Sequence, residues 1–123
     1  MTGEQIISNV DSLMPNQYST EQKVSWLSSL DGKIFNEVIL THEGARLLFY
    51  PFDGYDSDEC ELIVKPPYAD DLYGNYLKSR ICAENGEIAK YNQYVALYTN
   101  AYNEWAAWFN KKHMPRPSGK WVL

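Results

Sequence analysis

The feature that most constrains this chain is a stretch of 45 residues without proline, residues 68–112, which follows Pro66-Pro67. Its apolar side chains recur at steps of three, four or seven residues: Leu77, Ile81, Ile88, Tyr91, Val95, Tyr98, Tyr102, Trp105 and Phe109. This spacing is typical of helices that bury one side. Asn85-Gly86 is a turn sequence, and a helix of that length is rare in so short a chain, so we predict two helices at about 68–84 and 87–112. One continuous helix is the alternative.

Two further helices are expected near the N-terminus, because the spacing of a capping box occurs twice. Thr2 is followed three residues later by Gln5, and Ser19 by Gln22. Apolar stripes then predict helices at about 3–13 and 20–42. Asp31-Gly32 lies inside the second stripe without changing its phase, so we expect a weak point of about 1 kcal/mol there and no turn.

The segment 45–66 predicts a different structure. Gly44 suits the C-terminal cap of the preceding helix. Two β-prone runs, residues 47–50 and 62–64, flank an acidic stretch with a turn at Asp53-Gly54, which favours a short β-hairpin with a long tip. Such a hairpin must pack on helices or on a neighbouring subunit. The fold class expected is mainly α: one domain of four helices over residues 1–114, the last two long, with a loose basic tail at 115–123.

Length and charge exclude several classes of protein. The chain of 123 residues is long enough for one domain with a real core, and its 18 aromatic residues are wrong for a disordered chain. No signal peptide or membrane-spanning run is expected. Residues 1–110 hold 7 basic and 16 acidic residues, which argues against specific or general nucleic-acid binding. Residues 111–123 hold four basic residues and no acid, which leaves open a weak contact with DNA; a helix end with a loose tail is the simpler interpretation.

A search for chemistry finds no catalytic or metal-binding motif, so we predict no enzyme, no cofactor and no metal. His42 and His113 are far apart, and Cys60 and Cys82 belong to no metal-binding pair. Nucleotide-binding fingerprints are absent. The densest carboxylate cluster does not match a calcium-binding loop and is better explained as a solvated acidic loop: Asp53, Asp56, Asp58, Glu59 and Glu61.

The surface of the last helix is unusual. Between residues 88 and 110 only Lys90 and Glu104 are charged, and amides and aromatic side chains take the places that lysine and glutamate usually hold. Uncharged, aromatic-rich surface is favoured in protein–protein interfaces. The candidate interface residues on this helix are Tyr94, Tyr98, Tyr102, Trp105 and Trp108. The alternative is a helix whose aromatic side chains are buried within its own domain.

Two long stretches resemble a known group of proteins. They are PNQYSTEQKVSWLSSLDGKIFNEVILTHEG and DDLYGNYLKSRICAENGEIAKYNQYVALYTNAYNEWAAWFNKKHMP. Most of the likeness lies in Asn85-Gly86-Glu87, Tyr91-Asn92, Ala96-Leu97-Tyr98 and His113-Met114-Pro115. The chain thereby resembles small proteins from the head-morphogenesis modules of tailed phages and prophages of Gram-positive bacteria, and within that group the head–tail connector, or head-completion, proteins.

The resemblance implies a phage virion structural protein, a subunit of a homo-oligomeric ring beneath the portal. Its partners would be itself, the portal and tail-side connector proteins, and its location the head–tail interface after a stay in the host cytoplasm. Asp53, Asp56, Asp58 and Glu59 are candidates for a second contact. A soluble, non-enzymatic adaptor or regulator that binds one partner through its aromatic C-terminal helix is the alternative function.

Overall fold

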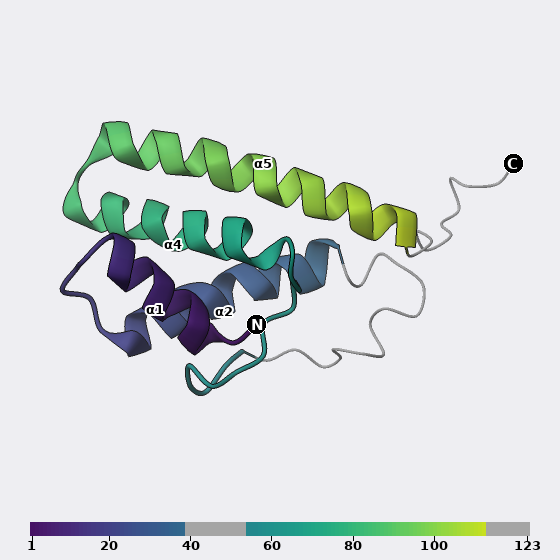
Figure 1. Ribbon diagram of the computed structural model, residues 1–123, viewed down its shortest axis with the longest axis horizontal. Helices are drawn as coiled ribbons and strands as arrows, with labels where there is room; N and C mark the ends of the chain where they lie inside the picture. The colour runs from purple at the N-terminus through teal and green to yellow at the C-terminus, as the bar shows by residue number, and fades with distance from the viewer. Residues whose placement is uncertain (39–53, 113–123) are drawn as a thin grey trace, which may run out of the picture.

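The computed structural model describes residues 1–38 and 54–112, and this part of the chain is mainly helical. Its helices, drawn in Figure 1, are α1 (Gly3–Leu13), α2 (Thr20–Glu37), α4 (Ala69–Asn85) and α5 (Ile88–Lys112). The predicted mainly α fold class and the break between two long C-terminal helices are confirmed. The tail 115–123 lies outside the described residues.

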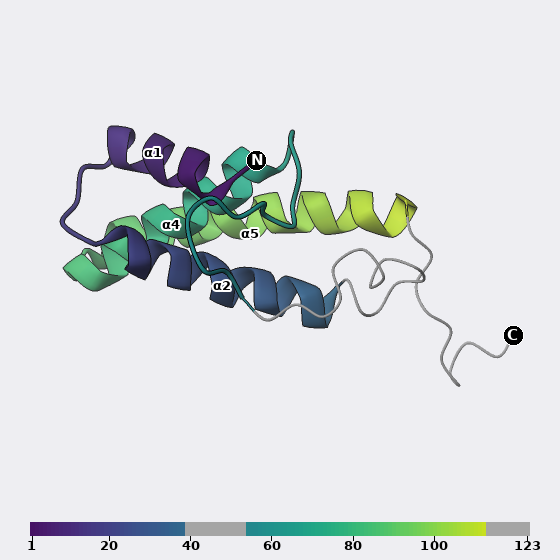
Figure 2. The same cartoon turned by 90° about the horizontal axis from the view of Figure 1, so that it is seen from below.

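The helices are arranged in layers around α4. Helices α4 and α5 run antiparallel, and α1 and α2 lie on the side of α4 away from α5 (Figure 1). The view from below shows α1 and α2 as neighbours in the near layer with α4 behind and between them (Figure 2). Helix α4 packs against each of the other three helices. It is therefore the central element of the fold.

The helix ends have the caps that the sequence predicts. Thr2 and Ser19 each accept a hydrogen bond from the backbone N–H three residues later, and Gln5 and Gln22 each accept one in return, which completes two capping boxes. At the end of α4, Gly86 has φ +77°, a left-handed conformation that glycine adopts without strain. Helix α2 ends at Glu37 with Val38 as its C-cap, whereas the stripe predicts 42; residues 39–42 and Gly44 lie outside the described part.

The apolar stripes predict seven residues in particular to be buried, and the core contains six of them. Five of them, Leu27, Leu30, Ile34, Leu77 and Ile81, are at most 1% exposed, and Val38 is 8% exposed. Val95 is the exception, because it is only half-buried. The physical reason is that α5 lies against one helix, α4, along its first half, so that every side chain from 88 to 100 keeps some exposure.

The predicted β-hairpin is not seen in the described residues. Its first run, 47–50, lies outside them, and residues 62–64 form no strand although all three side chains are buried. The segment instead meets the N-terminus: an isolated antiparallel bridge joins Thr2 to Glu61, and Leu62 N donates to Met1 O at 3.1 Å. The next two backbone N–H groups donate to helix side chains, so those groups need no second strand.

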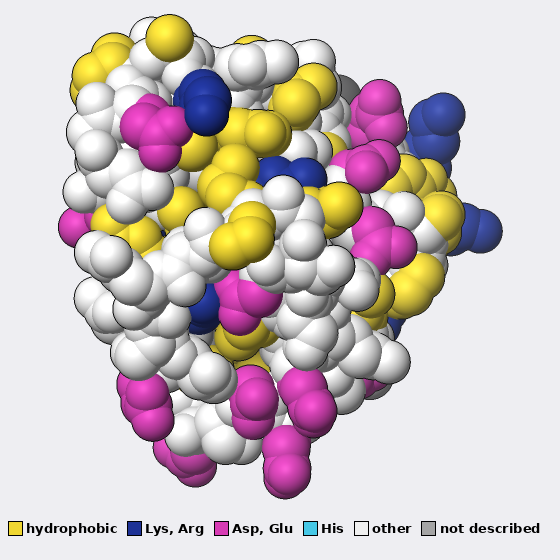
Figure 3. Space-filling model, turned by 60° about the vertical axis from the view of Figure 1, so that its left-hand side comes forward, with side chains coloured by type: hydrophobic (Ala, Val, Ile, Leu, Met, Phe, Trp, Pro, Cys, Tyr) yellow, Lys and Arg dark blue, Asp and Glu magenta, His cyan; other side chains and the backbone are white. Residues whose placement is uncertain are grey.

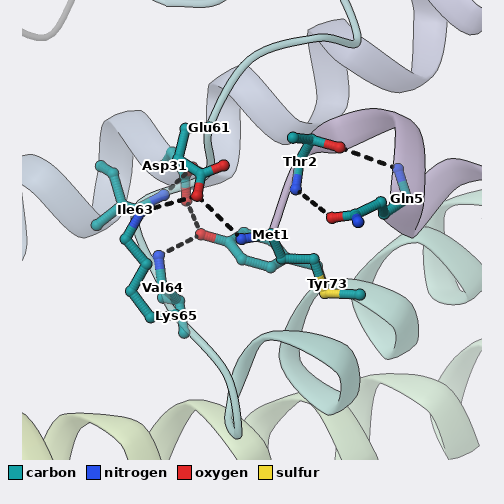
Figure 4. Close-up of polar contacts among 9 residues, drawn as sticks. All are labelled: Met1, Thr2, Gln5, Asp31, Glu61, Ile63, Val64, Lys65 and Tyr73. Carbon is teal, nitrogen blue, oxygen red and sulfur yellow. Dashed lines mark hydrogen bonds and ion pairs between the residues drawn. The ribbon is translucent and has the colours of Figure 1, made fainter.

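Those side chains form a buried polar cluster around Asp31, which is 0% exposed (Figure 4). Its carboxylate accepts hydrogen bonds from Tyr73 OH at 2.6 Å, from Ile63 N at 3.2 Å and from Tyr55 OH. Tyr73 OH in turn accepts from Val64 N at 2.8 Å. The cluster thus ties the extended segment to both α2 and α4. No described cation pairs with Asp31.

An ion pair between a buried lysine and a partly exposed aspartate fixes the connection between α1 and α2. Lys23 is 3% exposed, and its Nζ lies 2.7 Å from Asp11 Oδ1. Asn16 in the connecting loop also donates to that oxygen at 3.0 Å. A lysine within an amphipathic helix is usually solvated, so this pair is a feature that the sequence pattern did not predict.

The first prediction tests the packing just described. Leu27→Ala should lower the free energy of unfolding by about 2–5 kcal/mol, because it leaves a cavity among fully buried side chains. Val95→Ala should cost only about 1 kcal/mol, since half of that side chain is already in water. Urea unfolding followed by circular dichroism measures both, and equal losses would contradict the packing of α5.

The second prediction concerns pH. Burial raises the pKa of Asp31, and the hydrogen bonds from Tyr55, Tyr73 and Ile63 offset only part of that rise. Between the ordinary pKa of an aspartate and this raised value, the folded protein binds more protons than the unfolded chain, so the Asp31 contribution to stability grows as pH falls and is lost as pH rises.

Asp31→Asn removes that titration, and it should destabilise the fold because the amide NH2 group cannot accept a hydrogen bond where the carboxylate oxygen does. The difference in unfolding free energy between the natural protein and the variant should widen from pH 8 towards pH 4. Titrations shared by both proteins cancel in this difference. A constant or narrowing difference would contradict the raised pKa.

Candidate interface on the last helix

The inner side of α5 is a continuous series of aromatic rings. Neighbouring ring centroids lie 5.3 to 6.1 Å apart along the series Tyr76, Tyr98, Tyr102, Trp105 and Phe109, of which all but Tyr76 belong to α5. These distances are typical of stabilising ring pairs. Burial raises the pKa of the Tyr98 hydroxyl, as expected for a ring half withdrawn from water. The aromatic residues of α5 therefore pack mainly within their own domain.

The five aromatic candidates differ in their accessibility. Trp105 is 2% exposed and belongs to the core, so it is removed from the candidate interface. Tyr98 and Tyr102 are half-buried in the ring series. Tyr94 is half-buried with Lys78 Nζ 5.7 Å from its ring centroid. Trp108 is 36% exposed and lies 5.5 Å from the ring of Tyr68, which leaves it the most accessible aromatic of the five.

The outer side of α5 carries the uncharged character that the sequence indicates. Bordered by the exposed Leu97 and Glu104, its exposed side chains are mainly amides, threonine and alanine: Asn92, Gln93, Ala96, Thr99, Asn100, Asn103, Ala107 and Asn110. We call this set the outer face. No charged residue occurs between Lys90 and Glu104. Amides can donate and accept hydrogen bonds, and hydrogen-bonded amides cost less to remove from water than charged groups, so the outer face is suited to burial against another protein.

The acidic candidates lie on the other side of the molecule. Asp56 and Glu59 are exposed, Asp58 is half-buried, and Asp53 lies outside the described residues. In the space-filling view, acidic side chains gather along the lower edge, the side on which α2 and the segment 54–61 lie in Figure 1 (Figure 3). A hollow of about 480 Å³ separates this segment from the start of α2. The two groups of candidate residues are therefore separated by α4.

Neither cysteine is paired in the structure: Cys60 is half-buried and Cys82 is buried. Burial raises the pKa of both thiols. Within residues 1–38 and 54–112, no group of three or more His, Cys, Asp or Glu side chains is placed to hold a metal ion. His42 and His113 lie outside these ranges. None of the helices described has the length and apolar character needed to cross a bilayer.

Comparisons of the chain with protein-family models, with curated proteins and with solved structures gave no match.

The structure adds polar residues that sequence analysis did not single out, namely Asp31, Tyr55, Tyr73 and Lys23. A signal for Asp31 was present, because it lies four residues after Leu27 and three before Ile34, on the stripe that becomes buried. No local pattern identifies its partners, which are 24, 32 and 42 residues away along the chain.

The third prediction separates the two sides of α5. The double variant Asn100→Lys, Asn103→Lys should unfold within about 0.5 kcal/mol per substitution of the natural protein, because both side chains already face water. Tyr98→Lys should cost at least about 2 kcal/mol, since it removes a half-buried ring and puts a charge in its place. Thermal unfolding compares them, and a large loss in the double variant would show that the outer face is covered.

Proposed function

We propose that this chain is a non-enzymatic structural subunit of a tailed-phage particle, a head–tail connector that forms a ring beneath the portal. The outer face of α5 is the observation that carries the proposal. A helix whose outer side stays exposed to solvent usually bears charged side chains on that side. Here that side has no charged residue over three turns, between Lys90 and Glu104, and depletion of charge is a property of the buried centre of protein interfaces.

The order of the elements is consistent with this proposal. Connectors of the resembled group have short N-terminal helices, a hairpin or loop, and longer C-terminal helices. The described part of this chain has α1 and α2, a non-helical segment, and then α4 and α5. Agreement in order supports the proposal by analogy alone, and the surface chemistry supports it independently.

The distribution of charge suits a subunit with more than one neighbour. A closed ring needs two different patches on each subunit, and contacts with the portal and with tail-side proteins need others. The outer face of α5 and the acidic side near Asp56 and Glu59 lie apart, with α4 between them. We assign the first to contact between subunits and the second to a partner with a basic surface.

The fourth prediction tests this function in purified particles of the phage whose genome encodes the chain. Mass spectrometry should find the protein at a fixed copy number per particle, and electron microscopy should place it at the head–tail junction. The variant Asn100→Lys, Asn103→Lys should leave filled heads without tails, because charge on the outer face blocks its burial. Ser29→Lys with Asn36→Lys, two exposed positions on α2, is the matched control and should give normal particles.

Two outcomes would contradict the proposal. Absence of the protein from particles would remove the connector function and favour an adaptor that binds one partner. Normal yields of infectious particles with the outer-face variant would show that α5 is not the assembly surface.

A further inference from the structure

A groove between α1 and α4 forms a surface that the fold leaves uncovered. Its volume is about 420 Å³, and Ile6, Val10 and Leu13 line it from α1. Leu13 is 72% exposed, the highest value among the large apolar side chains described. On the α4 side, a Cβ added at Gly74 would meet no atom within 4 Å, so the groove is open at that point. Ile6 and Val10 are almost fully buried at the base of the groove, so Leu13 supplies most of its accessible apolar surface, beside the polar side chains of Asn9, Ser12 and Asn75.

The rim of the groove is acidic. Asp70 and Asp71 lie on the α4 side, both are exposed, and neither makes an ion pair with a described residue. Asp71 also lines a second hollow of about 190 Å³, which contains Glu104 of α5. The single lysine of the groove, Lys78, is directed to the ring of Tyr94. The two aspartates lie in the first turn of α4, where the helix dipole favours negative charge. They also lie beside the apolar side chain of Leu13 in the groove.

The C-terminal end of α5 has the complementary properties. It continues past the start of α4, as the yellow-green end of the ribbon shows (Figure 1). Lys111 and Lys112 occupy its last turn; both are exposed, and neither forms an ion pair within the described ranges. Trp108, one turn earlier, is 36% exposed. This end therefore presents two positive charges beside an accessible aromatic ring.

We propose that the α1–α4 groove of one subunit receives the C-terminal end of α5 from a second copy of this chain. Trp108 supplies apolar surface to the groove, and Lys111 and Lys112 meet Asp70 and Asp71 at its rim. The occupant is a second copy because its charge and apolar surface match those of the groove. The contact is heterologous, as a ring requires; the inference rests on the ring proposed above and adds a contact between subunits that is distinct from the outer face of α5.

The test exchanges the charges of the two surfaces. Asp70→Lys with Asp71→Lys makes the groove basic, and Lys111→Glu with Lys112→Glu makes the helix end acidic. Each variant alone then opposes like charges and should self-associate at least about tenfold more weakly than the natural protein. Mixed in equal amounts, the two variants present opposite charges at every contact and should recover association.

Sedimentation velocity of the full-length chain, from micromolar to about millimolar concentration, gives the association constants. The natural protein should form species larger than dimers, and its association should weaken as salt rises. Glu4→Lys with Glu21→Lys changes the net charge equally at two exposed positions outside the groove and the helix end, and should leave self-association unchanged. Circular dichroism and thermal unfolding show whether each variant is folded.

The outcomes separate this inference from the proposed function. A natural protein that stays monomeric at every concentration, or mixed variants that fail to associate although folded, would overturn the groove contact even if the protein is found in particles. Restored association in the mixture, with the protein absent from particles, would leave the contact standing and remove the connector function.

Discussion

The hydrogen bonds to the buried carboxylate of Asp31 join parts of the fold that share little other structure. Burial of a charged carboxyl is costly, and three donors from α4 and the segment 54–64 offset the cost. By holding that segment, Asp31 also places Glu61 and Leu62 beside the N-terminus, where they pair with Thr2 and Met1. Asp31 of α2 therefore helps to position α1 indirectly, through the segment 61–64.

The two sides of helix α5 differ in what they contact. The aromatic side chains pack against α4 and against one another within the domain. This packing stabilises the fold and holds the helix in one orientation. That orientation turns the amides outward. The residues that suggest an interface in the sequence thus divide into an inner set, which packs in the domain, and an outer set, which is exposed.

Local signals account for what could be predicted from the sequence. Capping boxes, the Asn85-Gly86 turn and the apolar stripes act over three to seven residues, and they identified the helices and six of the seven residues expected in the core. The failures involve contacts between distant residues. Periodicity cannot tell that one helix alone covers the first half of α5, so the partial exposure of Val95 was not predicted. Nor can it tell that helix side chains will satisfy Ile63 and Val64 in place of a strand.

The separation of Asp31 from its partners along the chain bears on the order of folding. Helices α4 and α5 are joined by a two-residue turn and meet through local contacts, which close quickly. The Asp31 hydrogen bonds instead close loops of 24, 32 and 42 residues, whose entropy must be lost before the bonds form. We therefore expect the α4–α5 pair to form first and the carboxylate cluster to form after the transition state. Changes at Asp31 would act on the rate of unfolding and leave the rate of folding nearly untouched.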